Sequence, residues 1–93
     1  MISDYKYLID IMEILGKKWV VPILLLLLVC EKTTFSKLKK ELKITSRALS
    51  KKLKILETLG LIEKNFNKGT KNIYYVLSDK GNTLSSLLLS LNK

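Results

Sequence analysis

The sequence contains no histidine and only one cysteine, Cys30, among its 93 residues. Zinc and iron centres are built largely from histidine and cysteine ligands, so no metal site of ordinary spacing can be assembled, and we expect no cofactor. A single thiol cannot form an internal disulfide, which suits a protein of the reducing cytoplasm. Two interpretations of Cys30 stay open: a small buried side chain, or a bridge between two molecules.

Proline and glycine are scarce too, with one and four residues, whereas 47% of the residues are hydrophobic. A chain of this composition can bury enough surface to fold, and its length predicts a single domain over residues 1–93. The longest apolar run, Val20–Cys30, is well short of the roughly 20 residues that span a bilayer as a helix. It therefore predicts a buried core helix, with no membrane span and no signal peptide.

The groups that usually carry catalysis are missing as well. The chain has no histidine base, no glycine-rich phosphate loop and no closely spaced pair of acids. We therefore expect a protein that is not an enzyme.

Acidic residues are few, since 8 Asp and Glu stand against 17 Lys and Arg and leave a net charge of +9. Residues 32–71 hold twelve of the basic residues and three of the acids, so this segment alone accounts for the whole excess. Charge gathered in this way predicts a surface that binds a polyanion. A lysine-rich solubilising surface is the alternative, whereas a membrane partner is disfavoured because the apolar positions of the segment look internal.

Hydrophobic spacing and capping residues divide the chain into helices and strands. Gly16 ends the first helix, and the first turns of the second contain Trp19 and Pro22; a proline is tolerated in an opening turn because its missing N–H would have no partner there. Ser36 and Thr45 can cap the next two helices, and Gly60 provides a left-handed terminator. The expected elements are helices over 4–15, 17–31, 36–42 and 46–59, a short strand at 33–35, a hairpin of 61–66 with 73–77, and a last helix that begins at Ser78 and Asp79.

The order of these elements indicates the fold class. Two short helices joined by the tight connection Lys43-Ile44 describe a helix-turn-helix. The hairpin that follows has a basic tip, 67–72, and stands where a wing would. We therefore expect an α+β, mostly helical winged helix-turn-helix.

The helix expected over 46–59 has two chemically different sides. Leu49, Leu53 and Leu56 recur at helical spacing and predict the buried side. The opposite side combines long donors and small hydroxyls without an acid: Arg47, Ser50, Lys51, Lys54 and Thr58. This side has the chemistry of a nucleic-acid surface.

Four motifs stand in order along the chain: Lys18-Trp19 with Pro22, Phe35-Ser36-Lys37-Leu38, Leu56–Ile62 and Leu77–Gly81. They lie in the stretches Ile14–Leu27, Thr34–Asn65 and Ile73–Leu84. In this order and spacing, the stretches resemble the HxlR branch of the MarR-like superfamily of winged helix-turn-helix regulators. Many relatives carry a sensing cysteine near the N-terminus and a proline in the wing. Neither feature is present here, so no sensing role is transferred to Cys30.

The resemblance implies a homodimeric regulator that binds double-stranded DNA, with helix 46–59 in the major groove and the wing on the backbone or minor groove. Arg47 is the best candidate for reading a base, because its planar fork can bond a guanine edge through two donors. Ser46 and Ser50 could reach bases or phosphates, and the lysines suit phosphates. The candidate DNA-binding residues are Ser36, Lys37, Ser46, Arg47, Ser50, Lys51, Lys54, Lys68 and Lys71.

Apolar stripes on the first and last helices predict the dimer interface, because recognition of a palindrome calls for two copies. The candidate interface residues are Tyr5, Leu8, Ile9, Met12, Leu84, Leu87, Leu88 and Leu91. Packing within the chain's own core is the alternative for each of them. A winged-helix module that binds protein or RNA in a larger complex is the alternative for the function as a whole.

Overall fold

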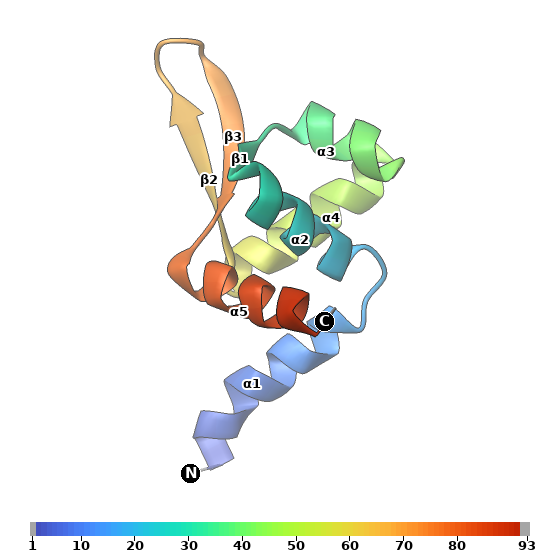
Figure 1. The fold of residues 1–93 in the computed structure, drawn as a ribbon, viewed down its shortest axis with the longest axis vertical. Coiled ribbons are helices and arrows are strands. Elements are labelled where there is room, and N and C mark those ends of the chain that lie inside the picture. The colour runs from blue at the N-terminus through green and yellow to red at the C-terminus, as the bar shows by residue number, and fades with distance from the viewer. Residues whose placement is uncertain (1, 92–93) are drawn as a thin grey trace.

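The computed structural model describes residues 2–91. It contains five helices and a three-stranded antiparallel sheet in the order that the sequence predicts (Figure 1). Residues 1, 92 and 93 of the expected domain lie outside the described part. The elements are α1 (Ile2–Leu15), α2 (Val20–Cys30), β1 (Lys32–Thr33), α3 (Phe35–Leu42), α4 (Ser46–Thr58), β2 (Ile62–Asn67), β3 (Asn72–Leu77) and α5 (Asp79–Ser90). The winged helix-turn-helix fold is confirmed.

Helix α2 forms the centre of the core. Its residues Ile23, Leu24 and Leu27 are at most 1% exposed, because α1, α3, α5 and the sheet all pack around it. No helix within residues 2–91 is long and apolar enough to cross a membrane. The apolar run is thus a core helix, as its length predicts.

Helix α2 begins three residues later than expected. Trp19 adopts a left-handed backbone conformation with φ of 76°, which interrupts the helical path between Lys17 and Val20. Pro22 is the third residue of the helix and lies in its first turn, where a proline removes no intrahelical hydrogen bond.

The cap of α3 differs from the expected one. The Thr34 hydroxyl accepts a hydrogen bond from the Lys37 amide at 3.2 Å, so Thr34 is the N-cap and Ser36 lies within the first turn. The preceding strand is correspondingly early, since Lys32 and Thr33 pair with Val76 and Tyr75 of β3. The expectation of Ser36 as the cap was wrong, because Thr34 has the extended backbone that a cap requires and Ser36 does not.

The strand order β1-β3-β2 attaches the wing to the body through β1. The hairpin runs from the pair Ile62–Leu77 near the core to the pair Asn67–Asn72 at the tip. The Asn67 side chain accepts hydrogen bonds from the amides of Gly69 and Thr70, at 2.9 and 3.2 Å, and so closes the turn. The hairpin projects beyond the helices (Figure 1), and the two hydrogen bonds of Asn67 define its tip.

The junction between α4 and α5 is tightly packed. The Ser78 hydroxyl accepts from the Gly81 amide at 3.0 Å, which caps α5, and donates to the Gly60 carbonyl at 2.6 Å. Gly81 is buried against the backbone of Leu61, so close that an added Cβ would lie 1.9 Å from the Leu61 carbonyl oxygen. This contact explains why the motif Leu77–Gly81 ends in glycine.

We expect Gly81→Ala to destabilise the protein by about 2 kcal/mol or more, because the methyl group would overlap backbone that cannot yield. Gly16→Ala is the matched control, since its Cβ would meet nothing closer than 3.4 Å. Thermal and urea unfolding of both variants measure the difference. Equal stability of Gly81→Ala and the parent protein would show that the junction is looser than described.

Candidate nucleic-acid interface

The two sides of α4 are separated as the sequence predicts. Leu49, Leu53 and Leu56 are at most 1% exposed and belong to the main hydrophobic core. Arg47, Ser50, Lys51, Lys54 and Thr58 are all exposed. We call the three leucines the leucine row and the five exposed residues the basic row. Because successive helical residues are 100° apart, burial of the leucine row turns the basic row outward.

The start of α4 is fixed by the turn before it. Lys43 ends α3 in a left-handed conformation with φ of 53°, and Ile44 is buried at 5% exposure. The Thr45 hydroxyl then accepts from the Ala48 amide at 3.1 Å, which confirms the expected cap. Ser46 and Arg47 therefore lie in the first turn of a well-anchored helix.

The end of α4 is equally defined. Gly60 has φ of +74°, its amide donates to the Glu57 carbonyl at 2.9 Å, and the Leu61 amide donates to the Leu56 carbonyl at 3.0 Å. This pair of bonds is the Schellman arrangement, with Leu61 buried as its hydrophobic contact. The predicted left-handed terminator is confirmed.

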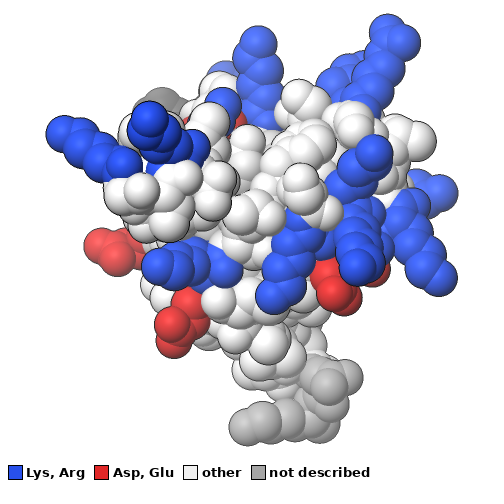
Figure 2. Space-filling view, turned by 90° about the horizontal axis from the view of Figure 1, so that it is seen from above, with Lys and Arg blue, Asp and Glu red and all other residues white. Residues whose placement is uncertain are grey.

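All nine candidate DNA-binding residues are exposed, and they come from three neighbouring elements. Figure 2 looks at the end of the molecule that carries the wing, where Lys and Arg side chains surround most of the surface and few acids are visible. Ser36 and Lys37 belong to α3, and Lys68 and Lys71 to the turn of the wing. The remaining candidates are on α4: Ser46, Arg47, Ser50, Lys51 and Lys54.

A cleft of about 400 Å³ separates α4 from the hairpin. Ser50 and Lys54 line it from α4, and Lys64 and Tyr75 line it from the strands. Burial, with a smaller effect from the Glu57 carboxylate, raises the pKa of Tyr75 above 10.0, so its hydroxyl is neutral at physiological pH. Lys64 was not among the candidates, although strand alternation places it on the same hairpin face as the buried Ile62.

A second cleft, of about 260 Å³, lies between the start of α3 and the wing. Lys32, Lys37 and Thr70 are among its lining residues, and the Lys32 ammonium lies 5.3 Å from the centre of the Tyr74 ring. Sequence reasoning missed Lys32, because only the pairing of β1 with β3 brings it beside the wing. The first cleft thus brings basic side chains of α4 beside the hairpin, and the second brings those of α3 beside it.

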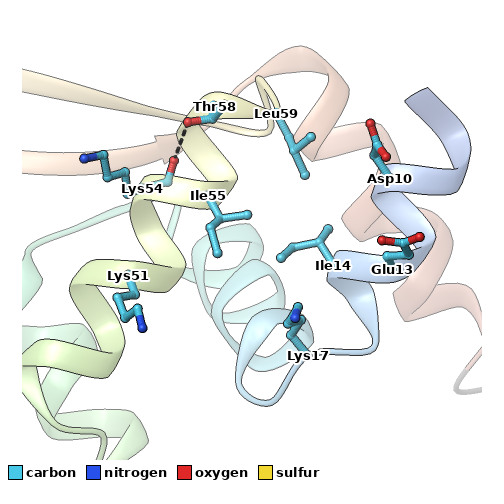
Figure 3. A pocket seen from close by; sticks show the side chains of 9 residues that line it. All are labelled: Asp10, Glu13, Ile14, Lys17, Lys51, Lys54, Ile55, Thr58 and Leu59. Atoms are coloured by element: carbon cyan, nitrogen blue, oxygen red, sulfur yellow. Dashed lines mark hydrogen bonds between the residues drawn. The ribbon is translucent and has the colours of Figure 1, made fainter. Parts of the chain in front are cut away.

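A third hollow, a groove of about 500 Å³, lies between α1 and α4 (Figure 3). Ile14 of α1 faces Ile55 and Leu59 of α4 across its apolar part (Figure 3). Lys51 and Lys54 contribute to the same groove. The side of α4 that carries these lysines therefore borders α1 as well as solvent.

Tyr7 attaches α1 to the end of α4. Its hydroxyl donates to the Leu59 carbonyl at 2.6 Å, and the Lys80 ammonium lies 4.7 Å from the centre of its ring. Nothing in the helical spacing of Tyr7 predicts this contact, because its partner is 52 residues away.

The eight candidate dimer residues fall into two groups. Leu84 and Leu88 are half-buried against the chain's own core. The others are 52–80% exposed: Tyr5, Leu8, Ile9, Met12, Leu87 and Leu91. Leu89, which was not a candidate, is also exposed at 45%. The exposed group lies on α1 and at the end of α5, away from the wing (Figure 1).

The fold, together with the exposed basic residues of α3, α4 and the wing, defines the class of winged helix-turn-helix proteins. Solved structures with a similar fold agree with this class. HlyU of Vibrio cholerae has a TM-score of 0.83 and 22% identity, with 98% of this chain and 97% of that one aligned. The transcriptional repressor BigR of Xylella fastidiosa has a TM-score of 0.82 and 21% identity, over 96% and 86%. A ZitR variant of Lactococcus lactis has a TM-score of 0.74 and 24% identity, with 80% of this chain aligned. The aligned part spans about half (51%) of the ZitR chain.

The family follows from the sequence itself. The model of the HxlR-like helix-turn-helix family matches residues 14–93, and the chain belongs to that family. No curated protein matches the chain. The family is one of DNA-binding transcription regulators, not of enzymes, as the sequence predicts. Within residues 2–91, no three potential metal ligands are grouped closely enough to hold an ion.

We expect Thr45→Ala to lower the free energy of unfolding by about 1 kcal/mol, because α4 would lose its cap. Thr45→Ser keeps a hydroxyl in place and is the control, with most of the stability retained. Urea unfolding followed by circular dichroism measures both. Identical midpoints for alanine and serine would mean that the hydroxyl does not stabilise the helix.

Proposed function

We propose that the protein is a cytoplasmic, homodimeric regulator that binds double-stranded DNA in a sequence-specific manner, with α4 in the major groove and the wing, 67–72, on the backbone or minor groove. The observation that carries this proposal is the separation of α4 into a buried leucine row and an exposed basic row. A helix of this kind fits the width of the major groove.

The roles within this surface follow from side-chain chemistry. Arg47 can bond a guanine edge through two donors, and its place in the first turn of α4 is typical of base-reading residues. Ser46 and Ser50 have a shorter reach and suit bases or phosphates. Lys37, Lys51 and Lys54 suit phosphates, as do the wing lysines and Ser36 at the start of α3.

The direct test is the binding of the protein to duplex DNA, duplex RNA and single strands at two salt concentrations. We expect a duplex selected from a random library to bind at least about 10³ times more tightly than unselected DNA. Equal affinity for all duplex DNA would overturn sequence specificity. Preference for RNA, or no binding to either, would favour a module that binds RNA or protein.

Within the binding face, we expect Arg47→Ala to weaken binding to the selected duplex by about 1–3 kcal/mol and binding to random DNA much less. Lys68→Ala should weaken both and reduce the slope of log K against log salt by about 1. Lys6→Ala is the control, because the Lys6 side chain is also exposed, at 78%, but lies on α1. Equal losses on both kinds of DNA for Arg47→Ala would contradict a base-reading role.

The proposed dimer interface is the exposed apolar surface of α1 and α5. Met12 and Leu87 are 64% and 61% exposed, so aspartate at either position should leave the fold of one copy intact. We expect Met12→Asp and Leu87→Asp to be monomers in analytical ultracentrifugation at concentrations where the parent is a dimer. Val29→Asp, which changes an equally exposed residue of α2, should remain dimeric. A monomeric parent protein, or two dimeric variants, would refute this interface.

A further inference from the structure

The hairpin carries an apolar pair that neither the core nor the proposed dimer interface uses. Phe66 of β2 and Ile73 of β3 are directly opposite each other in the hairpin, and they are 57% and 46% exposed. Single exposed apolar residues are common on protein surfaces. Phe66 and Ile73, however, face each other one residue pair before the tip of the hairpin, and together they form a small continuous apolar surface.

The register shows which way this pair faces. Lys64 pairs with Tyr75, and the next pair on the same hairpin face is Phe66 with Ile73, because side chains alternate along a strand. Lys64 and Tyr75 line the cleft that Ser50 and Lys54 of α4 line from the other side. The apolar pair is therefore the outward continuation of the hairpin face that looks onto α4.

The spacing matches a duplex seated on α4. Two residues along a strand advance about 7 Å, so the pair lies that far beyond Lys64 towards the tip. Lysines stand on both sides of the pair along the chain, Lys64 before it and Lys68 and Lys71 in the turn after it. A minor groove has a similar alternation of charged and apolar surface, because its two phosphate walls, with a groove only about 6 Å wide between them, flank the sugar edges.

A second copy of the chain is a poorer occupant. The molecule is 45 Å long, with α1 extending to the end opposite the hairpin tip and α5 lying between α1 and the hairpin (Figure 1). A dimer formed through the exposed apolar residues of α1 and α5 therefore leaves the hairpin tip free. The pair is also bordered by lysines, which repel an identical surface and attract a phosphate backbone.

We propose that Phe66 and Ile73 form an apolar contact with the deoxyribose edges of the minor groove, next to the major groove that α4 occupies. This inference rests on the proposed function, since it requires a duplex on α4. The apolar contact would add affinity without neutralising phosphates. Lys64, which lies between α4 and the apolar pair, would contact a phosphate.

The test compares Phe66→Thr/Ile73→Thr with the parent protein on the selected duplex. Threonine keeps the preference for strand structure, and both side chains are exposed, so the hairpin should persist. We expect affinity to fall about tenfold through lost apolar burial, with an unchanged salt slope. Lys64→Ala should instead reduce that slope by about 1. Val29→Thr is the control for loss of an exposed apolar group and should bind like the parent.

A second measurement needs no substitution. In the complex of the unsubstituted protein with the selected duplex, nuclear Overhauser effects should connect the Ile73 methyl groups and the Phe66 ring with deoxyribose protons. Their absence, or unchanged affinity of the double variant, would overturn the inference while binding of the parent to the duplex still supports the proposed function. Failure of the parent to prefer any duplex would overturn both.

Discussion

The orientation of α4 depends on one constraint, the burial of its three leucines. Leu49, Leu53 and Leu56 share a hydrophobic core with the central helix α2. Burying a leucine side chain contributes about 1.5–3 kcal/mol, and burying an unpaired lysine would cost more than that. Rotating α4 would expose the leucines and bury the lysines, and both changes would cost free energy. The basic row therefore points outward. The charged surface is thus a consequence of the core, and the lysines themselves contribute little to stability.

Much of this arrangement could be predicted from the sequence, because the signals are local. The leucine row, the cap at Thr45 and the terminator at Gly60 each depend on residues within one or two turns of the helix. The apolar run of α2 is long enough for a core helix and too short for a membrane. These signals agree with one another and with the family motifs, which is why the fold class and the exposed side of α4 were correct.

The remaining features depend on contacts between distant residues. Thr34 displaced Ser36 as the cap of α3 because the pairing of β1 with β3 fixes where the chain leaves the sheet. Lys64 joins the cleft beside α4 only through the register of the hairpin. The leucines of α5 look alike in the sequence, yet Leu84 packs on the core and Leu87 does not. The spacing of apolar residues within a helix does not determine the angle at which the helix packs against its neighbours.

The claim that the outward side of α4 and the wing meet DNA is tested most directly by lysine acetylation of the protein, alone and bound to a selected duplex, with the modified sites located by mass spectrometry. We expect the duplex to protect Lys51, Lys54, Lys64, Lys68 and Lys71, whereas Lys6 and Lys80 should react as before. Protection of Lys6 and Lys80 instead, or equal protection of all lysines, would contradict the claim.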